Sequence, residues 1–84
     1  MHYVYILQTE YLDEMYVGCT NDLKHRIVEH NSGKVPSTKA KIPYKLIHYE
    51  AFQNKHDAFE RGQFLKTGWG KRFIKKNLRN YFHD

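Results

Sequence analysis

The segment YVYILQTEYLDEMYVGC (residues 3–19) contains two short runs of β-branched, aromatic and aliphatic residues with a polar connection between them. Residues of these types favour strands, and the run over residues 3–7 is apolar on both faces. The run over residues 15–19 predicts a second strand, and residues 8–14 are polar enough to connect the two. We therefore expect an antiparallel hairpin with a longer loop.

The residues that follow this hairpin predict a helix over residues 23–31. Either Asn21 or Asp22 can cap the helix, because the side chain of each can accept a hydrogen bond from a free backbone N–H of the first turn. Gly33 suits the left-handed backbone that commonly ends a helix. The first helix is therefore expected to follow the second strand after a very short turn.

The remaining sequence predicts a loop, a strand and two more helices. In chain order these are a loop over residues 34–43, a strand over residues 44–52, a helix over residues 55–66 that ends at Gly68-Trp69-Gly70, and a helix over residues 71–82. The expected fold is a single α/β (α+β) domain over residues 1–84, with a small three-stranded antiparallel sheet flanked by three helices in the order ββαβαα.

The charge of the chain favours a polyanionic partner. The 84 residues carry a formal net charge of +5, with a pI near 9.4. The segment from Lys66 to Arg79 holds six basic residues and no acidic one. A small basic domain attracts polyanions over roughly 8–10 Å, and nucleic acid is the partner that this charge favours. A surface charged only for solubility is the alternative.

Several classes of protein are disfavoured by composition. Cys19 is the single cysteine, so the chain predicts neither an internal disulfide nor a zinc site built on cysteines. No apolar run approaches the ~18–20 residues that span a bilayer. Met1-His2-Tyr3 leads directly into the first strand, so no signal peptide is expected. We expect a cytoplasmic protein with no membrane partner, and a monomer.

Tyrosines of the hairpin and two basic residues of the first helix form a candidate site. Arg26 and His30 are four residues apart and share a helix face. A guanidinium there can bind a phosphate oxygen and stabilise negative charge, and an imidazole can relay a proton. A surface arginine and a capping histidine are the alternative, as core packing is for the tyrosines.

The chain resembles a GIY-YIG nuclease domain, of the small stand-alone bacterial kind that is similar to the N-terminal domain of an excision-repair nuclease. The resemblance covers nearly the whole chain, and it depends on the combination and spacing of its motifs. They are YVY at 3–5, YVG at 16–18 after ten intervening residues, Arg26 and His30, STK at 37–39, and LKTGWGKRF at 65–73.

The resemblance implies metal-dependent endonuclease activity on DNA, with a role in DNA repair. It implies that Tyr5 and Tyr16 help to activate the attacking water. A phenol has a reference pKa near 10, so a nearby cation is needed to lower that pKa, and Arg26 or a metal ion can serve. Arg26 would hold the scissile phosphate and His30 would assist. Gly18 is expected to allow close approach of the substrate or the first helix.

Basic residues elsewhere are expected to bind the nucleic-acid backbone. Lys39 lies in the STK loop, beside the expected cleft. The last predicted helix has a basic face formed by Lys71, Arg72, Lys75 and Lys76. Contacts of this kind supply affinity and salt dependence, and they do not read sequence.

One position departs from the family pattern. The family places a glutamate on the second helix, where it holds one divalent cation, Mg²⁺ or Mn²⁺. In this chain Ala58 and Lys66 fit the pattern, but Gly62 stands where the glutamate is expected. Glu60 is two residues away, about 200° around the helix, and is a poor substitute. Neither Glu29 nor Glu50 has a spacing that supports a replacement.

Three interpretations therefore remain open. The first is an active endonuclease. The second is a nucleic-acid-binding module on the same scaffold, with catalysis weakened through Gly62, because a metal ion contributes several kcal/mol to such reactions. The third is a protein-interaction domain within a larger repair assembly.

Overall fold

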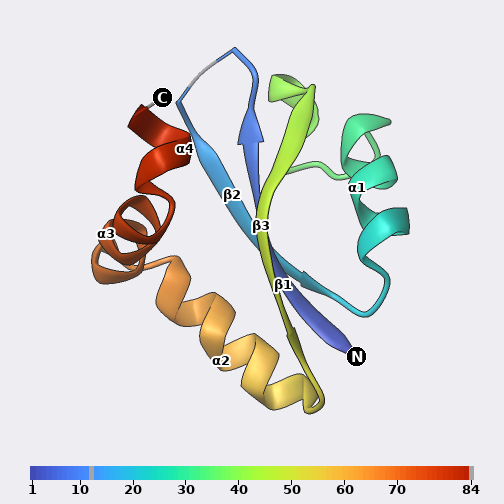
Figure 1. Ribbon diagram of the computed structural model, residues 1–84. Helices are drawn as coiled ribbons and strands as arrows, with labels where there is room; N and C mark the ends of the chain where they lie inside the picture. The colour runs from blue at the N-terminus through green and yellow to red at the C-terminus, as the bar shows by residue number, and fades with distance from the viewer. Residues whose placement is uncertain (12, 84) are drawn as a thin grey trace.

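The computed structural model describes residues 1–11 and 13–83 of the chain. Leu12, in the connection predicted over residues 8–14, and Asp84, the last residue of the predicted domain, lie outside the described residues. The elements in chain order are β1 (His2–Thr9), β2 (Met15–Thr20), α1 (Leu23–Asn31), a 3-10 turn η1 (Lys39–Lys41), β3 (Tyr44–Phe52), α2 (Lys55–Leu65), α3 (Gly68–Asn77) and α4 (Arg79–His83), as Figure 1 shows.

The three strands form one antiparallel sheet in the order β2-β1-β3, as predicted. β1 is the central strand, with Tyr5 opposite Gly18 of β2 and opposite Tyr49 of β3. The register with β3 shifts between Ile6 and Leu7. β2 is therefore an edge strand, and β1 is its one paired neighbour in the described sheet.

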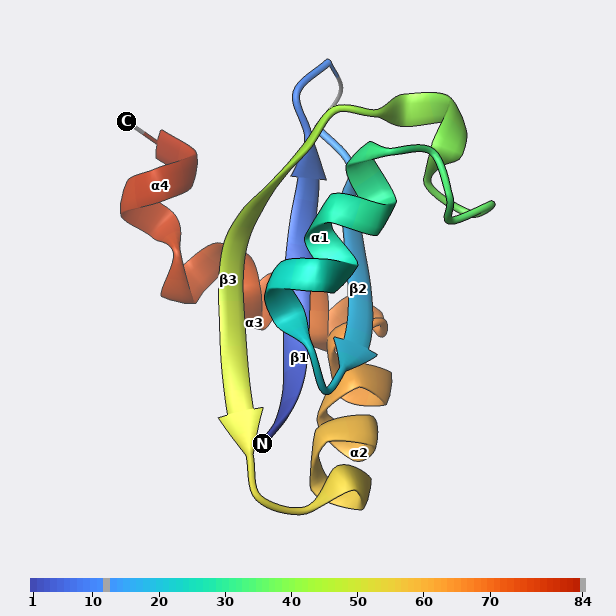
Figure 2. The same ribbon diagram turned by 90° about the vertical axis from the view of Figure 1, so that its right-hand side faces the viewer.

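Helices cover both faces of this sheet. α1 lies on one face, whereas α2, α3 and α4 lie on the other (Figures 1 and 2). Alternate residues of β1 divide between the two layers: Val4 and Ile6 pack with α2 and α3, and Tyr5 and Leu7 pack on the α1 side. This arrangement explains why β1 is apolar on both faces.

α1 is fixed at both ends by side-chain hydrogen bonds. Of the two candidate caps, Asp22 is the one used, because its carboxylate accepts a bond from the backbone N–H of His25 at 3.2 Å. Gly33 has a φ of 76°, the left-handed value predicted for it. The Asn31 side chain donates to the Tyr44 carbonyl at 2.9 Å and accepts from the Tyr44 N–H at 2.7 Å. These bonds join the end of α1 to the start of β3.

The prediction that Gly68-Trp69-Gly70 ends the second helix is wrong, since these residues form the first turn of α3. The chain breaks instead at Thr67, whose backbone is extended and whose hydroxyl accepts a bond from the Gly70 N–H at 3.1 Å. A Cβ at Gly70 would lie 2.1 Å from the carbonyl oxygen of Phe64. Gly70 therefore permits α3 to start directly against the end of α2.

The helix predicted over residues 71–82 is divided in two at Leu78, so four helices flank the sheet rather than three. Leu78 has a ψ of 31°, which interrupts the helical backbone between α3 and α4. The predicted buried stripe is nevertheless present: Ile74 is in the core of the α2 side, with Phe73, Leu78 and Phe82 packed against it. Packing was thus predicted more accurately than the helix boundaries.

Candidate active site

A chain of three hydrogen-bonded side chains lies between β1 and α1. The hydroxyl of Tyr5 is 2.8 Å from Nε2 of His30, and Nδ1 of His30 is 2.8 Å from Oγ1 of Thr38. All three residues are buried, with 1%, 0% and 1% of their surfaces exposed. His30 is therefore a fully enclosed side chain with a partner at each ring nitrogen.

The hydrogen bonds of Thr38 indicate which ring nitrogen of His30 carries the proton. The Thr38 hydroxyl donates to the carbonyl oxygen of Val35 at 3.4 Å, so its oxygen is free to accept from Nδ1–H of His30. Nε2 of a neutral imidazole is then unprotonated and accepts a hydrogen bond from the Tyr5 hydroxyl.

Tyr16 and Arg26 complete a cluster that the sequence predicted as a site. The Tyr16 ring centroid lies 5.0 Å from that of His30 and 6.3 Å from that of Tyr5. The Arg26 guanidinium is close to both the Tyr5 hydroxyl and Glu29, with Nη1 at 3.4 Å from a Glu29 oxygen. Tyr16 and Arg26 are partly exposed, so they form the accessible side of the cluster.

Burial controls the protonation of the enclosed pair. Burial raises the pKa of Tyr5, and the nearby Arg26 guanidinium offsets only part of this rise. Burial and then the charge of Arg26 lower the pKa of His30, against a smaller opposite effect of Glu29. The expectation that a nearby cation lowers the pKa of the phenol is therefore met by Arg26 but outweighed by desolvation.

Gly18 makes room for the Tyr5 ring. A Cβ at position 18 would lie 2.4 Å from the Tyr5 hydroxyl oxygen and 3.0 Å from a ring carbon of Tyr16. The sequence led us to expect close approach of the substrate or of the helix. The neighbours that require a glycine here are instead the two tyrosine rings, which can converge because β2 presents no side chain at this point.

The predicted nucleic-acid-binding lysines fall in two places. Lys39 is exposed and directly follows Thr38, so it lies at the end of the hydrogen-bonded chain described above. The four predicted basic residues of α3 are also exposed, namely Lys71, Arg72, Lys75 and Lys76. α3 lies on the opposite face of the sheet from α1 (Figure 1). Lys71 and Lys75 line a hollow together with Met15 of β2, the residue before Tyr16.

The surroundings of Gly62 do not fit the metal ion that the resemblance implies. Gly62 is buried in α2, and a Cβ there would lie 3.0 Å from Sγ of Cys19. Glu60 is exposed on another side of the helix. Among the described residues, no three histidine, cysteine, aspartate or glutamate side chains gather closely enough to hold a metal ion. Within that part of the chain, no cluster of metal-binding side chains therefore compensates for the missing glutamate.

The two other candidate carboxylates have cationic partners. Glu50 receives hydrogen bonds from Arg61 at 2.9 and 3.2 Å and lies 3.0 Å from His48. Burial acts to raise the pKa of Glu50, but these hydrogen bonds and charges together lower it. Glu29 pairs with Arg26. Glu50 therefore has a structural role on β3, whereas Glu29 borders the cluster.

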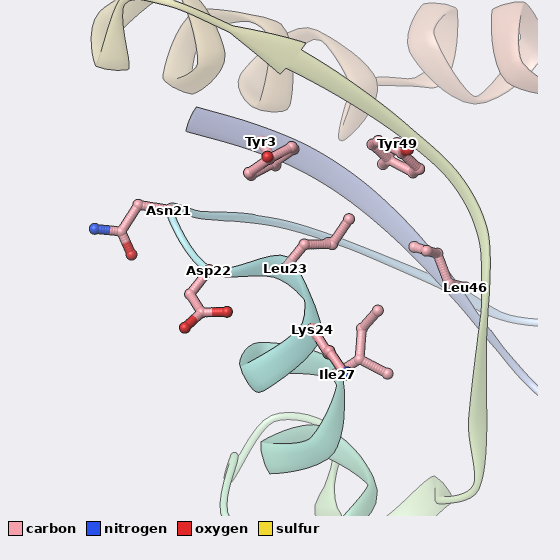
Figure 3. A pocket seen from close by; sticks show the side chains of 8 residues that line it. All are labelled: Tyr3, Asn21, Asp22, Leu23, Lys24, Ile27, Leu46 and Tyr49. Carbon is pink, nitrogen blue, oxygen red and sulfur yellow. The ribbon is translucent and has the colours of Figure 1, made fainter. Parts of the chain in front are cut away.

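A separate hollow lies between the start of α1 and β3 (Figure 3). Its lining does not include the four predicted catalytic residues; it consists of Tyr3, Asn21, Asp22, Leu23, Lys24, Ile27, Leu46 and Tyr49. Tyr49 was expected to pack in the core but is 52% exposed, with its ring edge against Tyr3 at 6.0 Å. Tyr44, also expected in the core, is buried.

Thr38 is the residue of this site that the sequence analysis did not identify. It lies in the STK motif, where only the lysine was selected as a phosphate contact. Threonine is common in loops. The separation of eight residues between His30 and Thr38 in the sequence does not predict a contact between the two side chains. The folded loop brings Thr38 against His30 of α1. Its position next to Lys39 in the STK motif was the one feature of the sequence that could have marked it as a site residue.

Comparisons with known proteins find relatives of this chain. The chain is 43% identical over 68 residues to a UPF0213 protein of Clostridium perfringens, a match covering 79% of this chain and 71% of that protein. It is 38% identical to a UPF0213 protein of Bacillus pumilus, over 92% and 76% of the two chains. None of the described helices has the length and apolar character needed to span a bilayer.

A solved structure and a family model complete the comparison. The solution NMR structure of the UPF0213 protein BH0048 of Bacillus halodurans matches with a TM-score of 0.56 and 32% identity, over 89% of this chain and 82% of that one. The model of the GIY-YIG catalytic domain matches residues 1–80, which include the tyrosines, Arg26 and His30. The chain therefore belongs to the GIY-YIG catalytic domain family, a family of nuclease domains.

Proposed function

We propose that this protein is an endonuclease that hydrolyses phosphodiester bonds in DNA. The observation that carries the proposal is the convergence of Tyr5, Tyr16, Arg26 and His30 on one cluster. The Tyr5–His30 bond of 2.8 Å joins a phenol to an unprotonated imidazole nitrogen, and a guanidinium lies beside that phenol. A proton acceptor next to a phosphate-binding cation is the arrangement that phosphodiester hydrolysis requires.

The accessible pair contacts the substrate. Arg26 binds a non-bridging oxygen of the scissile phosphate and stabilises the charge that develops as the bond to the attacking oxygen forms. Tyr16, partly exposed beside it, orients the attacking water. Glu29 restrains the guanidinium from the other side at 3.4 Å. Arg26 thereby bridges the phosphate and the Tyr5 hydroxyl.

The enclosed pair accepts the proton of the water. Substrate binding must admit the attacking water to the Tyr5 hydroxyl, since Tyr5 is 1% exposed in the resting site. Tyr5 then passes its hydroxyl proton to Nε2 of His30 while it receives a proton from the water, and the hydroxide so formed attacks the phosphorus. The bond from phosphorus to the leaving oxygen breaks and solvent protonates that oxygen. After the product leaves, His30 returns its extra proton through Tyr5 to solvent, which restores the neutral imidazole. The raised pKa of Tyr5 keeps the phenol protonated in the resting site, and the lowered pKa of His30 keeps Nε2 free to accept. Nδ1–H stays bonded to Thr38 throughout.

A second candidate function is nucleic-acid binding with weakened catalysis, and Gly62 favours it. Family membership leads us to expect one divalent cation, Mg²⁺ or Mn²⁺. The residues around Gly62 do not fit that ion, because Cys19 lies where a side chain at position 62 would begin. We therefore assign no step of the reaction to a metal ion. Loss of metal assistance would slow cleavage and leave binding by Lys39 and the basic face of α3 intact.

One assay separates the two functions. The protein is incubated with supercoiled plasmid and with branched DNA, in Mg²⁺ or Mn²⁺, beside an Arg26→Ala variant. Nicking that depends on Arg26 supports the endonuclease. Binding without nicking supports the binding module, and absence of both at low salt contradicts both functions and favours a protein-interaction domain of a larger assembly.

A further inference from the structure

The tryptophan at the start of α3 is the most exposed apolar feature of the basic surface. Trp69 is 72% exposed, although a tryptophan side chain is normally largely buried. Its exposure follows from the helix junction. Gly70, the next residue, is packed against the carbonyl of Phe64, and Ile74 is buried in the core, so the side of α3 that carries Trp69 faces outward.

Arg72 holds the indole from one side. The Arg72 guanidinium carbon lies 4.9 Å from the centre of the Trp69 ring, within the range of a cation–π contact. Arg72 is three residues after Trp69, so the two share one side of the helix. With one aromatic face against a cation and most of the side chain in solvent, the other face is free to receive a planar partner.

Charge selects the class of that partner. α3 contains no acidic residue, and its four charged residues, Lys71, Arg72, Lys75 and Lys76, are all basic and exposed. Lys76 lies on the same side as Trp69 and Arg72, and Lys75 lies on the adjoining side. Basic side chains around an exposed aromatic ring are the features that bind single-stranded nucleic acid, with phosphates on the cations and a base on the ring.

The position of α3 connects this surface to the candidate active site. Lys71 and Lys75 line a hollow with Asp13, Glu14 and Met15, and Met15 precedes Tyr16 on the edge strand β2. A nucleic-acid strand that crosses the β2 edge would contact the cluster of Tyr16 and Arg26 on one face of the sheet and α3 on the other. α3 and the candidate active site therefore both adjoin β2, from opposite faces of the sheet, with the carboxylates of Asp13 and Glu14 beside the lysines.

We infer that Trp69, backed by Arg72, is a stacking site for an unpaired base of a nucleic-acid strand, and that substrates with a single-stranded segment are preferred. The inference rests on the proposed function for its account of the substrate, but the stacking itself requires no cleavage. A membrane surface is the alternative partner for a tryptophan on a basic helix. It is disfavoured because Phe73 and Ile74, the apolar side of α3, pack against the protein core.

Trp69 is the single tryptophan of the chain, so its fluorescence reports on this site alone. The indole is excited where tyrosine does not absorb, and the protein is titrated with oligothymidine and with a blunt duplex of equal length, without divalent cation. Stacking predicts strong quenching by oligothymidine and weak quenching by the duplex. Unchanged emission when oligothymidine is saturating would overturn the inference.

Substitutions test whether the stacked ring contributes affinity. Trp69→Ala is expected to weaken oligothymidine binding about 5- to 100-fold, measured by the anisotropy of a labelled strand, with a smaller loss for Trp69→Phe. Phe59→Ala is the control, since Phe59 is an exposed ring on α2, 54% accessible. Lys75→Gln should weaken single-strand and duplex binding alike and reduce the salt dependence. Equal affinity of Trp69→Ala and the wild type would contradict the stacking site.

Two further results separate the inference from its alternatives. A blue shift of Trp69 emission with anionic phosphatidylglycerol vesicles, and no response to oligothymidine, would replace the stacking site by a membrane contact. Quenching by oligothymidine in a protein that nicks no DNA would support the stacking site and contradict the proposed cleavage. Nicking of DNA without quenching of Trp69 would support the proposed cleavage and contradict the stacking site.

Discussion

The hydroxyl of Tyr5 and Nε2 of His30 lie 2.8 Å apart in a contact closed to solvent, with 1% and 0% of the two residues exposed. The contact joins the central strand of the sheet to the last turn of α1, so the same bond is part of the core and of the candidate active site. A buried polar pair of this kind is stable only when every polar atom has a partner. Thr38 supplies the partner that His30 would otherwise lack.

Thr38→Val should change the protonation of His30 at its two ring nitrogens. Valine keeps the shape but offers no acceptor to Nδ1–H, so the unprotonated nitrogen is no longer restricted to Nε2. We expect the ¹⁵N shifts of the His30 ring to show a mixture of tautomers, and nicking to fall about 10- to 100-fold. Thr38→Ser keeps the hydroxyl and should restore both. Wild-type ring shifts in Thr38→Val would contradict the assigned role.

The lowered pKa of His30 predicts a loss of stability in mild acid. In the unfolded chain the imidazole binds a proton as the pH falls through about 6.5, whereas the buried His30 resists protonation until a lower pH. The unfolded state therefore binds more protons in that interval, and the free energy of unfolding decreases as the pH falls. His30→Gln has no such group, so urea unfolding across this interval should show a steeper loss in the wild type. Parallel curves for the two proteins would refute the prediction.

Gly18→Ala should displace the Tyr5 ring, because the new Cβ would lie 2.4 Å from its hydroxyl oxygen. Overpacking of this kind costs about 1–3 kcal/mol of unfolding free energy. Gly68→Ala is the matched control, since a Cβ there has no neighbour within 4 Å. Adding Tyr5→Leu, which removes both the hydroxyl and the Cζ carbon that would lie 2.5 Å from the new Cβ, should offset part of the loss in Gly18→Ala. Strictly additive effects in urea unfolding would show that the two positions are not coupled.

Gly62→Glu should create metal-dependent nicking only when Cys19 is also made smaller. A Cβ at position 62 lies 3.0 Å from the Cys19 thiol, so the new side chain needs the space that Cys19→Ala provides. The double variant is expected to nick plasmid faster than the wild type in Mg²⁺, with EDTA removing the gain. Gly62→Gln with Cys19→Ala has the same shape without the charge and should show no gain. An equal gain for glutamine would mean that the carboxylate does not bind the metal.

The sequence was sufficient for the elements whose signals are local. Residue composition located β1, β2 and β3, and the Asp22 cap marks a helix start that the structure contains. The start of α3 was missed because Gly68-Trp69-Gly70 predicts a break when glycine is judged by helix propensity alone. The close contact of Gly70 with α2 is a tertiary reason for that glycine, and propensity does not include it.

Helix periodicity alone establishes which residues share a face: Arg26 with His30 on α1, and the basic side chains on α3. These relations could be predicted because the period of a helix is the same in any fold. Folding, in contrast, is what brings Tyr5, Thr38 and His30 into one buried chain and places Cys19 against Gly62. Those contacts join residues far apart in sequence, and burial rather than spacing sets the pKa values of Tyr5 and His30.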